Sequence, residues 1–274
     1  MTRVHAYAKV NLALVVGPRR EDGLHELASL VQRIDLADDL DLEPADELRI
    51  EGYAEDTLVA AALRRLGEAA GVRTGFRVRI EKRIPVAAGL GGGSSDAGAA
   101  LAAANALLPE PVSRELLLEI AFSLGSDVPF FLEPGPKLVE GAGERLTTLE
   151  LPRDFAVVVA LEHGAAKEST GAVYARFNEL DGSAAFDERR AALLCALSAL
   201  RTSRDLALLP PNDLARAAGR TTLVDRLRAA GAFRADVSGA GPAVYGLFHR
   251  RDEAQAAAGA LGEGAETWVA SPLW

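Results

Sequence analysis

The chain has 274 residues, of which 49% are hydrophobic and 25% are charged. This composition is typical of a globular protein and excludes intrinsic disorder. The formal net charge of −9 and the lack of a basic run argue against nucleic acid as the main partner. One cysteine, Cys195, excludes an internal disulfide, and no stretch approaches the roughly 18 apolar residues of a membrane span. Lys9 and Asn11 interrupt any apolar signal-peptide core, so we expect a soluble, cytoplasmic protein without a membrane partner.

The first predicted element is a strand over residues 4–16. Apolar residues alternate along it with period two, so one of its faces belongs to a core. The opposite face carries Lys9 and Asn11, which we expect to project together because residues two apart share a face of a strand. Taken alone, this face could also be a solvated sheet surface.

An antiparallel sheet and a helix are predicted next. The strand-like runs lie at residues 27–36, 40–42, 48–50 and 76–80. The helix is expected over residues 56–70, because Asp56 can cap its start and Gly71 stands where a left-handed residue commonly ends a helix.

Glycines and serines fill the connection between the strand at 76–80 and an alanine-rich helix predicted over 97–108. This glycine loop reads Gly89, Leu90, Gly91, Gly92, Gly93, Ser94 and Ser95. Glycine lets backbone N–H groups approach a ligand, and a helix that starts at Ser94 or Ser95 would direct its positive dipole end there. The loop therefore predicts a phosphate site. It matches neither the Walker A nor the dinucleotide-binding pattern, and a tight turn of small residues is the alternative.

The remaining predicted elements begin with a helix over 113–124, and a loop just past it carries Asp127. Around Leu151 the pattern restarts, so we expect a domain boundary that divides residues 1–150 from 151–274. The predicted elements of the second domain are strands at 155–161, 233–237 and 244–248 and helices near 170–178, 187–200, 213–218, 221–230 and 252–261.

Several segments together resemble the GHMP kinase superfamily of small-molecule kinases. The broad resemblance rests on Ala8–Asn11, Pro85–Ala97 and Asp236–Pro242. Further motifs narrow it to members that phosphorylate 4-diphosphocytidyl-2-C-methyl-D-erythritol: Asp22–Leu27, Gly125–Phe130 and Ser169–Tyr174. The resemblance implies an α+β fold of two domains, an N-terminal one like ribosomal S5 domain 2 and a ferredoxin-like C-terminal one.

The resemblance also implies a reaction, namely ATP-dependent phosphorylation of the 2-hydroxyl of this cytidine diphosphate ester of methylerythritol. That step belongs to the non-mevalonate route to isoprenoid precursors, and its cofactors are ATP and Mg²⁺. Asp127 would be the catalytic base, and Lys9 would hold Asp127 and stabilise negative charge in the transition state. Residues 89–95 would bind the phosphates, with Ser95 as a candidate metal ligand. In isolation, Asp127 could cap a turn and Lys9 could be a surface ammonium.

The same resemblance assigns residues that bind the acceptor. Asn11 would hydrogen-bond near the acceptor hydroxyl, His25 would read the edge of cytosine, and Tyr174 would stack on the base. The family usually has an aromatic residue before this histidine, whereas this chain has Leu24. We therefore expect weaker stacking on that side of the base.

A second loop of small residues, 238–242, is predicted near the C-terminus. Gly239 and Gly241 would let it donate backbone hydrogen bonds to the phosphates or the acceptor. A plain hairpin connection is the alternative reading of the loop.

Two other functions remain open from the sequence. The chain could be another GHMP kinase, of homoserine or mevalonate type, that differs at the acceptor pocket. It could also be a non-catalytic nucleotide-binding or RNA-binding protein on the same scaffold. The acidic charge balance and the presence of both Lys9 and Asp127 count against this last function.

Overall fold

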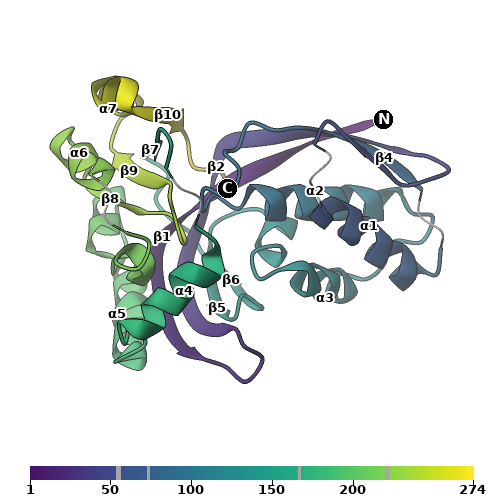
Figure 1. Cartoon of the computed structure of the whole chain (residues 1–274), viewed down its shortest axis with the longest axis horizontal. Helices are drawn as coiled ribbons and strands as arrows, with labels where there is room; N and C mark the ends of the chain where they lie inside the picture. The colour runs from purple at the N-terminus through teal and green to yellow at the C-terminus, as the bar shows by residue number, and fades with distance from the viewer. Residues whose placement is uncertain (54–56, 73–74, 166–167, 220–221) are drawn as a thin grey trace. The chain divides into compact units, whose positions relative to one another are not determined.

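A computed structural model describes residues 1–53, 57–72, 75–165, 168–219 and 222–274 (Figure 1). The chain folds into two compact units. The first unit contains residues 1–8, 36–87 and 91–134, and the second contains residues 9–35, 88–90 and 135–274. Strands β1 (Thr2–Arg19) and β2 (His25–Pro44) each contribute to both units. The predicted domain boundary near residue 150 stays a prediction.

In the part of the first unit that the structure describes, three helices pack against strands. Strand β2 pairs antiparallel with β4 (Phe76–Glu81), and β4 pairs parallel with β3 (Arg49–Glu51). The helices are α1 (Thr57–Ala70), α2 (Gly92–Leu107) and α3 (Arg114–Leu124), and a 3₁₀ turn, η1 (Pro129–Leu132), follows them. The helices gather on one side of β4 (Figure 1), where Val78 and Ile80 of the strand and Leu63 of α1 share one core. The alternation of β4 is that of the predicted half-buried strand.

The helix ends in this unit follow local sequence signals, with one exception. Gly71 has φ +65° directly after α1, as predicted. The helix predicted over 113–124 forms as α3, and the Ser113 side chain caps its start by accepting a hydrogen bond from Leu116 N. The predicted start of α2 at Ser94 or Ser95 is wrong, because the helix already begins at Gly92. Asp56, the predicted cap of α1, lies outside the described residues.

The second unit contains two groups of strands. In the first group, β2 pairs with β5 (Lys137–Gly141) and β5 with β6 (Arg145–Thr148). The second group is an antiparallel sheet in the order β10 (Ala265–Ala270), β7 (Ala156–Glu162), β9 (Val244–Phe248) and β8 (Arg234–Val237). Helices α6 (Leu223–Ala229) and α7 (Arg251–Leu261) share a buried core with this sheet.

The second unit also contains the helices α4 (Thr170–Glu179) and α5 (Phe186–Ala199) and the 3₁₀ turns η2 (Ser203–Leu208), η3 (Asp213–Ala215) and η4 (Gly262–Gly264). The helix predicted near 213–218 is therefore wrong in length, because only the turn η3 forms there. Strands β5, β6 and β10 were not predicted, and the runs predicted at 27–36 and 40–42 form one strand, β2. In the parts of the chain that the structure describes, no helix has the length and apolar character needed to cross a membrane.

Candidate active site

Lys9 and Asn11 form a buried polar pair on β1 in the second unit. The two residues are only 3% and 5% exposed, and Lys9 Nζ donates to Asn11 Oδ1 over 2.6 Å. Asn11 Nδ2 in turn donates to Ser29 Oγ at 2.9 Å, which fixes the orientation of the amide. The prediction that these side chains project together is confirmed, and the reading of a solvated face is wrong. Burying an ammonium costs free energy unless the group is paired and hydrogen-bonded. Buried charged groups of this kind are frequent at functional sites, so we take this pair as part of a candidate site.

The second-unit part of the glycine loop lies beside this pair. Lys9 N donates to Leu90 O at 3.0 Å, which joins the strand to the loop. Gly89 has φ +84°, and Ser238 Oγ donates to Gly89 O at 2.9 Å. A Cβ at Gly89 would lie 2.2 Å from Ser238 O, so only glycine fits at this close approach. The glycine loop therefore contacts the loop 238–242.

The loop 238–242 connects β8 to β9, so the alternative reading of a hairpin connection is also correct. It nevertheless reaches the polar pair. Gly239 has φ +56°, and a Cβ there would lie 3.4 Å from both Lys9 Nζ and Asn11 Oδ1. Gly241 has φ +72° and donates its N–H to Ser238 O at 2.9 Å. Within the second unit the structure thus brings together six predicted site residues: Lys9, Asn11, Gly89, Leu90, Gly239 and Gly241.

The rest of the glycine loop forms the start of α2 in the first unit. Gly91 is the N-cap with φ +73°, and Ser95 N donates to Gly91 O at 2.8 Å as the first bond of the helix. The N–H groups of residues 92–94 precede that bond, and Gly91 has no side chain that could cap them. These groups and the helix dipole suit an anion.

The hydroxyl of Ser95, in the predicted glycine loop, is hydrogen-bonded within the first unit. Its Oγ donates to Tyr7 O at 2.7 Å, and the residue is only 1% exposed. A hydroxyl in this position holds α2 to β1 within the first unit. The prediction that Ser95 binds Mg²⁺ has no support from this geometry.

A buried ion cluster that was not predicted lies at the same helix end. Lys82 Nζ is 2.5 Å from Asp38 Oδ2 and 2.6 Å from Asp96 Oδ2, and both carboxylates are fully buried. Burial opposes the charge of Lys82, but the two carboxylates outweigh it and raise the pKa of the lysine. A Cβ at Gly92 would lie 3.4 Å from Lys82 Nζ, which places this cation at the first turn of α2. The scarcity of lysine in the chain, four residues in all, was the available signal.

Asp127 lies on an exposed turn between α3 and η1 in the first unit. Val128 N donates to Gly125 O at 3.1 Å to close the turn. A Cβ at Gly98 would lie 3.4 Å from Val128 O, so the turn lies against α2. The loop placement of Asp127 is confirmed. Its pairing with Lys9 stays a prediction, because the two residues belong to different units.

His25 and Tyr174, the two residues predicted to bind the cytosine base, lie together in the second unit, and their binding of the base stays a prediction. Their ring centroids are 4.9 Å apart, and His25 is 8% exposed. His25 Nδ1 is 2.8 Å from Gly17 O; because a carbonyl only accepts, Nδ1 carries the proton and Nε2 of the neutral ring is an acceptor. Asn178, which was not predicted, approaches Nε2 with its Nδ2 at 3.4 Å. Asn178 follows Tyr174 by four residues on a helix, so the two side chains lie on the same face. This spacing could have indicated Asn178 from the sequence.

Comparison with known proteins places the chain in a family. The model of the GHMP kinases N terminal domain matches residues 57–135, and that of the GHMP kinases C terminal domain matches residues 221–266. A protein named 4-diphosphocytidyl-2-C-methyl-D-erythritol kinase from Anaeromyxobacter sp. (strain Fw109-5) is 40% identical over 267 residues, 94% of this chain and 86% of that protein. A protein of the same name from Deinococcus radiodurans is 39% identical, over 96% of this chain and 89% of that protein. This chain belongs to the 4-diphosphocytidyl-2-C-methyl-D-erythritol kinase family.

Solved structures agree with this membership of the 4-diphosphocytidyl-2-C-methyl-D-erythritol kinase family. The crystal structure of a 4-(cytidine 5′-diphospho)-2C-methyl-D-erythritol kinase matches with a TM-score of 0.79 at 35% identity, over all of both chains. The mevalonate kinase of L. major, in complex with R-mevalonate, matches with a TM-score of 0.73 at 16% identity, over 99% of this chain and 96% of that one. At that identity the likeness concerns the fold alone. The predicted α+β GHMP kinase fold is confirmed.

Proposed function

We propose that this protein transfers the γ-phosphoryl group of ATP to the 2-hydroxyl of 4-diphosphocytidyl-2-C-methyl-D-erythritol. The observation that carries the proposal is the identity of 39–40%, along more than nine-tenths of the chain, to proteins named for this kinase. We place the reaction in the cytoplasm, in the non-mevalonate route to isoprenoid precursors.

The geometry of each unit supports phosphoryl transfer. In the first unit, the N-terminus of α2 presents N–H groups and a dipole that suit the phosphates of ATP. In the second unit, the ammonium of Lys9 is buried and oriented by Asn11. Phosphoryl transfer depends mainly on positioning and on the stabilisation of charge, and both arrangements supply these.

Lys9 and Asp127 have complementary roles in the proposed reaction. Asp127 accepts the proton of the acceptor hydroxyl as the new P–O bond forms and the β–γ bridge bond of ATP breaks. Lys9 stabilises the negative charge that develops on the transferred group. Asn11 holds the ammonium by its Oδ1, which is why a short amide two residues away on the strand suits this position.

Magnesium enters the proposal as the partner of ATP. Mg²⁺ prefers phosphate and water oxygens, and it neutralises part of the triphosphate charge. Because Ser95 is buried and its hydroxyl donates to Tyr7 O, Ser95 fits a metal ligand poorly. We assign no protein ligand to the metal.

His25, Tyr174 and Asn178 form the proposed site for the cytosine base. With Nδ1 donating to Gly17 O, Nε2 is an acceptor, and the exocyclic amine of cytosine would replace Asn178 Nδ2, which approaches it at 3.4 Å. Tyr174 provides an aromatic surface beside His25. Leu24 is 41% exposed and offers an aliphatic contact in place of a second ring.

The test is ATP consumption by the purified protein with and without 4-diphosphocytidyl-2-C-methyl-D-erythritol. We expect turnover that depends on this acceptor, and a similar rate with homoserine or mevalonate instead would favour the other GHMP kinase activities. Asp127→Asn should retain the fold and lose about 10²–10⁴-fold in kcat. Asp154→Asn, an exposed loop aspartate, is the matched control and should keep the parent rate. Near-parent turnover of Asp127→Asn would remove Asp127 from the mechanism.

A further inference from the structure

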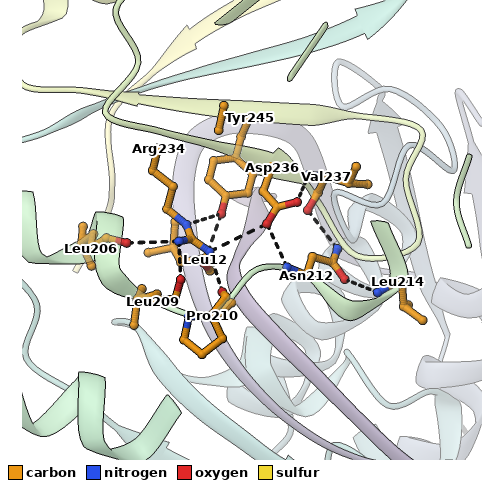
Figure 2. Close-up of polar contacts among 12 residues, drawn as sticks. Leu12, Leu206, Leu209, Pro210, Asn212, Leu214, Arg234, Asp236, Val237 and Tyr245 are labelled. Atoms are coloured by element: carbon orange, nitrogen blue, oxygen red, sulfur yellow. Dashed lines mark hydrogen bonds and ion pairs between the residues drawn. The ribbon is translucent and has the colours of Figure 1, made fainter. Parts of the chain in front are cut away.

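A buried network of polar side chains is hydrogen-bonded to the loop 238–242. The proposed reaction does not use these side chains directly. Figure 2 shows its members converging from β8, β9, β1 and the segment before η3. Asn212, Arg234, Asp236 and Tyr245 are all at most 8% exposed. Buried polar groups in proteins are nearly always hydrogen-bonded. A network in which every polar group has a partner makes the segments that it connects rigid.

Asn212 is the member that contacts the loop. Its Nδ2 donates to two carbonyl oxygens, Val237 O at 3.0 Å and Gly239 O at 2.7 Å. Its Oδ1 accepts from Leu214 N at 2.9 Å and caps η3 (Figure 2). One amide side chain therefore holds both the end of β8 and the first glycine of the loop.

Asn212 is itself held in place by the rest of the network. Its backbone N–H donates to Asp236 Oδ2 at 2.8 Å, and the residue pairs with Leu14 of β1 in an isolated bridge. Arg234 Nε donates to Tyr245 Oη at 3.1 Å, and Tyr245 Oη donates to Leu12 O at the same distance (Figure 2). Both anchors, Leu12 and Leu14, lie on the strand that carries Lys9 and Asn11. The network therefore ties the loop to the strand of the polar pair.

We propose that Asn212 is a positioning residue that sets Gly239 against the Lys9–Asn11 pair. Gly239 stands so close to that pair that a Cβ on it would lie 3.4 Å from both side chains. The carbonyl of the same glycine is bound by Asn212, so the amide fixes how far the loop stands from the ammonium. Asn212 acts through Gly239 and does not touch the reacting atoms. This inference rests on the proposed kinase function.

The test compares Asn212→Ser with Asn105→Ser. Serine at 212 still accepts from Leu214 N as a helix cap, but it is too short to reach both carbonyls. Asn105 is a matched control in the first unit, where its side chain exchanges two hydrogen bonds with Val112 at 2.9 and 3.3 Å. We expect Asn212→Ser to lower kcat about 10–100-fold, since misplacement by about 1 Å has effects of this size. Asn105→Ser should stay within about threefold of the parent.

A double-mutant cycle with Lys9→Met separates positioning from general destabilisation. If Asn212 acts through Gly239 on Lys9, the serine substitution should lower kcat by less than about threefold once the ammonium is gone. The same factor in both backgrounds would overturn the inference. Asn212→Ala, which also removes the cap, must show the same dependence on Lys9.

Amide hydrogen exchange tests the clamp without using activity. The N–H groups of Ser238 and Gly241 donate to Ala243 O and Ser238 O, so their exchange reports on the loop. We expect faster exchange in a peptide spanning residues 236–245 of Asn212→Ser and unchanged exchange there in Asn105→Ser. Unchanged exchange in Asn212→Ser would overturn the clamp. A parent protein without turnover would overturn the proposed kinase function instead, and the exchange result would still decide whether Asn212 holds the loop.

Discussion

Replacing Gly89 with alanine tests whether the glycine loop must contact the loop 238–242. Gly89 has φ +84°, and a Cβ on it would lie 2.2 Å from Ser238 O and 3.1 Å from Gly241 N. A carbon and a carbonyl oxygen in contact are about 3.3 Å apart, so the variant has to move one of the loops by about 1 Å. The three atoms nearest to that Cβ are all backbone atoms, of Ser238 and Gly241, so turning a side chain away cannot relieve the contact.

The expected loss in stability has two parts. A left-handed backbone costs a residue other than glycine about 1–2 kcal/mol, and forced overpacking adds about 1–3 kcal/mol. Gly89→Ala should therefore lower the free energy of unfolding by about 2–5 kcal/mol. Because the displaced residues adjoin Lys9, kcat should also fall about 10–100-fold.

Gly71→Ala isolates the first part of this loss. Gly71 has φ +65°, but a Cβ there meets nothing within 4 Å, so only the backbone strain of about 1–2 kcal/mol applies. Urea denaturation followed by circular dichroism measures both variants, together with steady-state ATP consumption. Equal losses for Gly89→Ala and Gly71→Ala, with kcat unchanged in both, would refute the close contact between the loops.

Lys82→Met should lower the free energy of unfolding at pH 7 by about 3–5 kcal/mol, because it removes the ammonium that pairs with two buried aspartates; urea denaturation should show partial recovery when one of them becomes asparagine. Leu24→Tyr should lower KM for the cytidine substrate about 2–10-fold without changing kcat, by adding a ring at the position directly before His25; an unchanged KM in steady-state kinetics would contradict this. Burial raises the pKa of Tyr245 from 10.0 to about 12, so the folded state favours the neutral phenol. The stability from this group should be complete below pH 10 and be lost as the pH rises towards 12; alkaline unfolding of Tyr245→Phe should lack this part of the slope, and an identical slope would refute the assignment.

Features set by local spacing could be predicted from the sequence. The pairing of Lys9 and Asn11 follows from the period of a strand, and the ends marked by Gly71 and Ser113 follow from backbone chemistry within one turn. The early start of α2 could not be predicted in this way. Glycine is a poor helix former, but a Cβ at Gly92 would lie only 3.1 Å from the Ile84 side chain, so tertiary packing favours glycine inside the first turn.

Features that depend on distant partners were out of reach of the sequence. Lys137 is fully buried in β5, and its Nζ donates to Thr148 Oγ1 on β6 at 2.9 Å. A lone lysine in a short run does not indicate an interior strand, since the compensating hydroxyl comes eleven residues later. Asn212 and Gly239 are separated in the same way, by 27 positions. The pairing of Lys9 with Asp127 stays a prediction that the kinetics of the variants would test.

Each compact unit is made of several segments that are separated in the sequence. The backbone passes from one unit to the other at five points, after residues 8, 35, 87, 90 and 134. No single cut can therefore release either unit as an unbroken fragment. The first unit cannot be complete before residue 134 has been synthesised, and the second cannot be complete before residue 274. Contacts between residues far apart in the chain are slow to form. On the ribosome, β2 must accordingly wait for its partners β4 and β5, which are synthesised later.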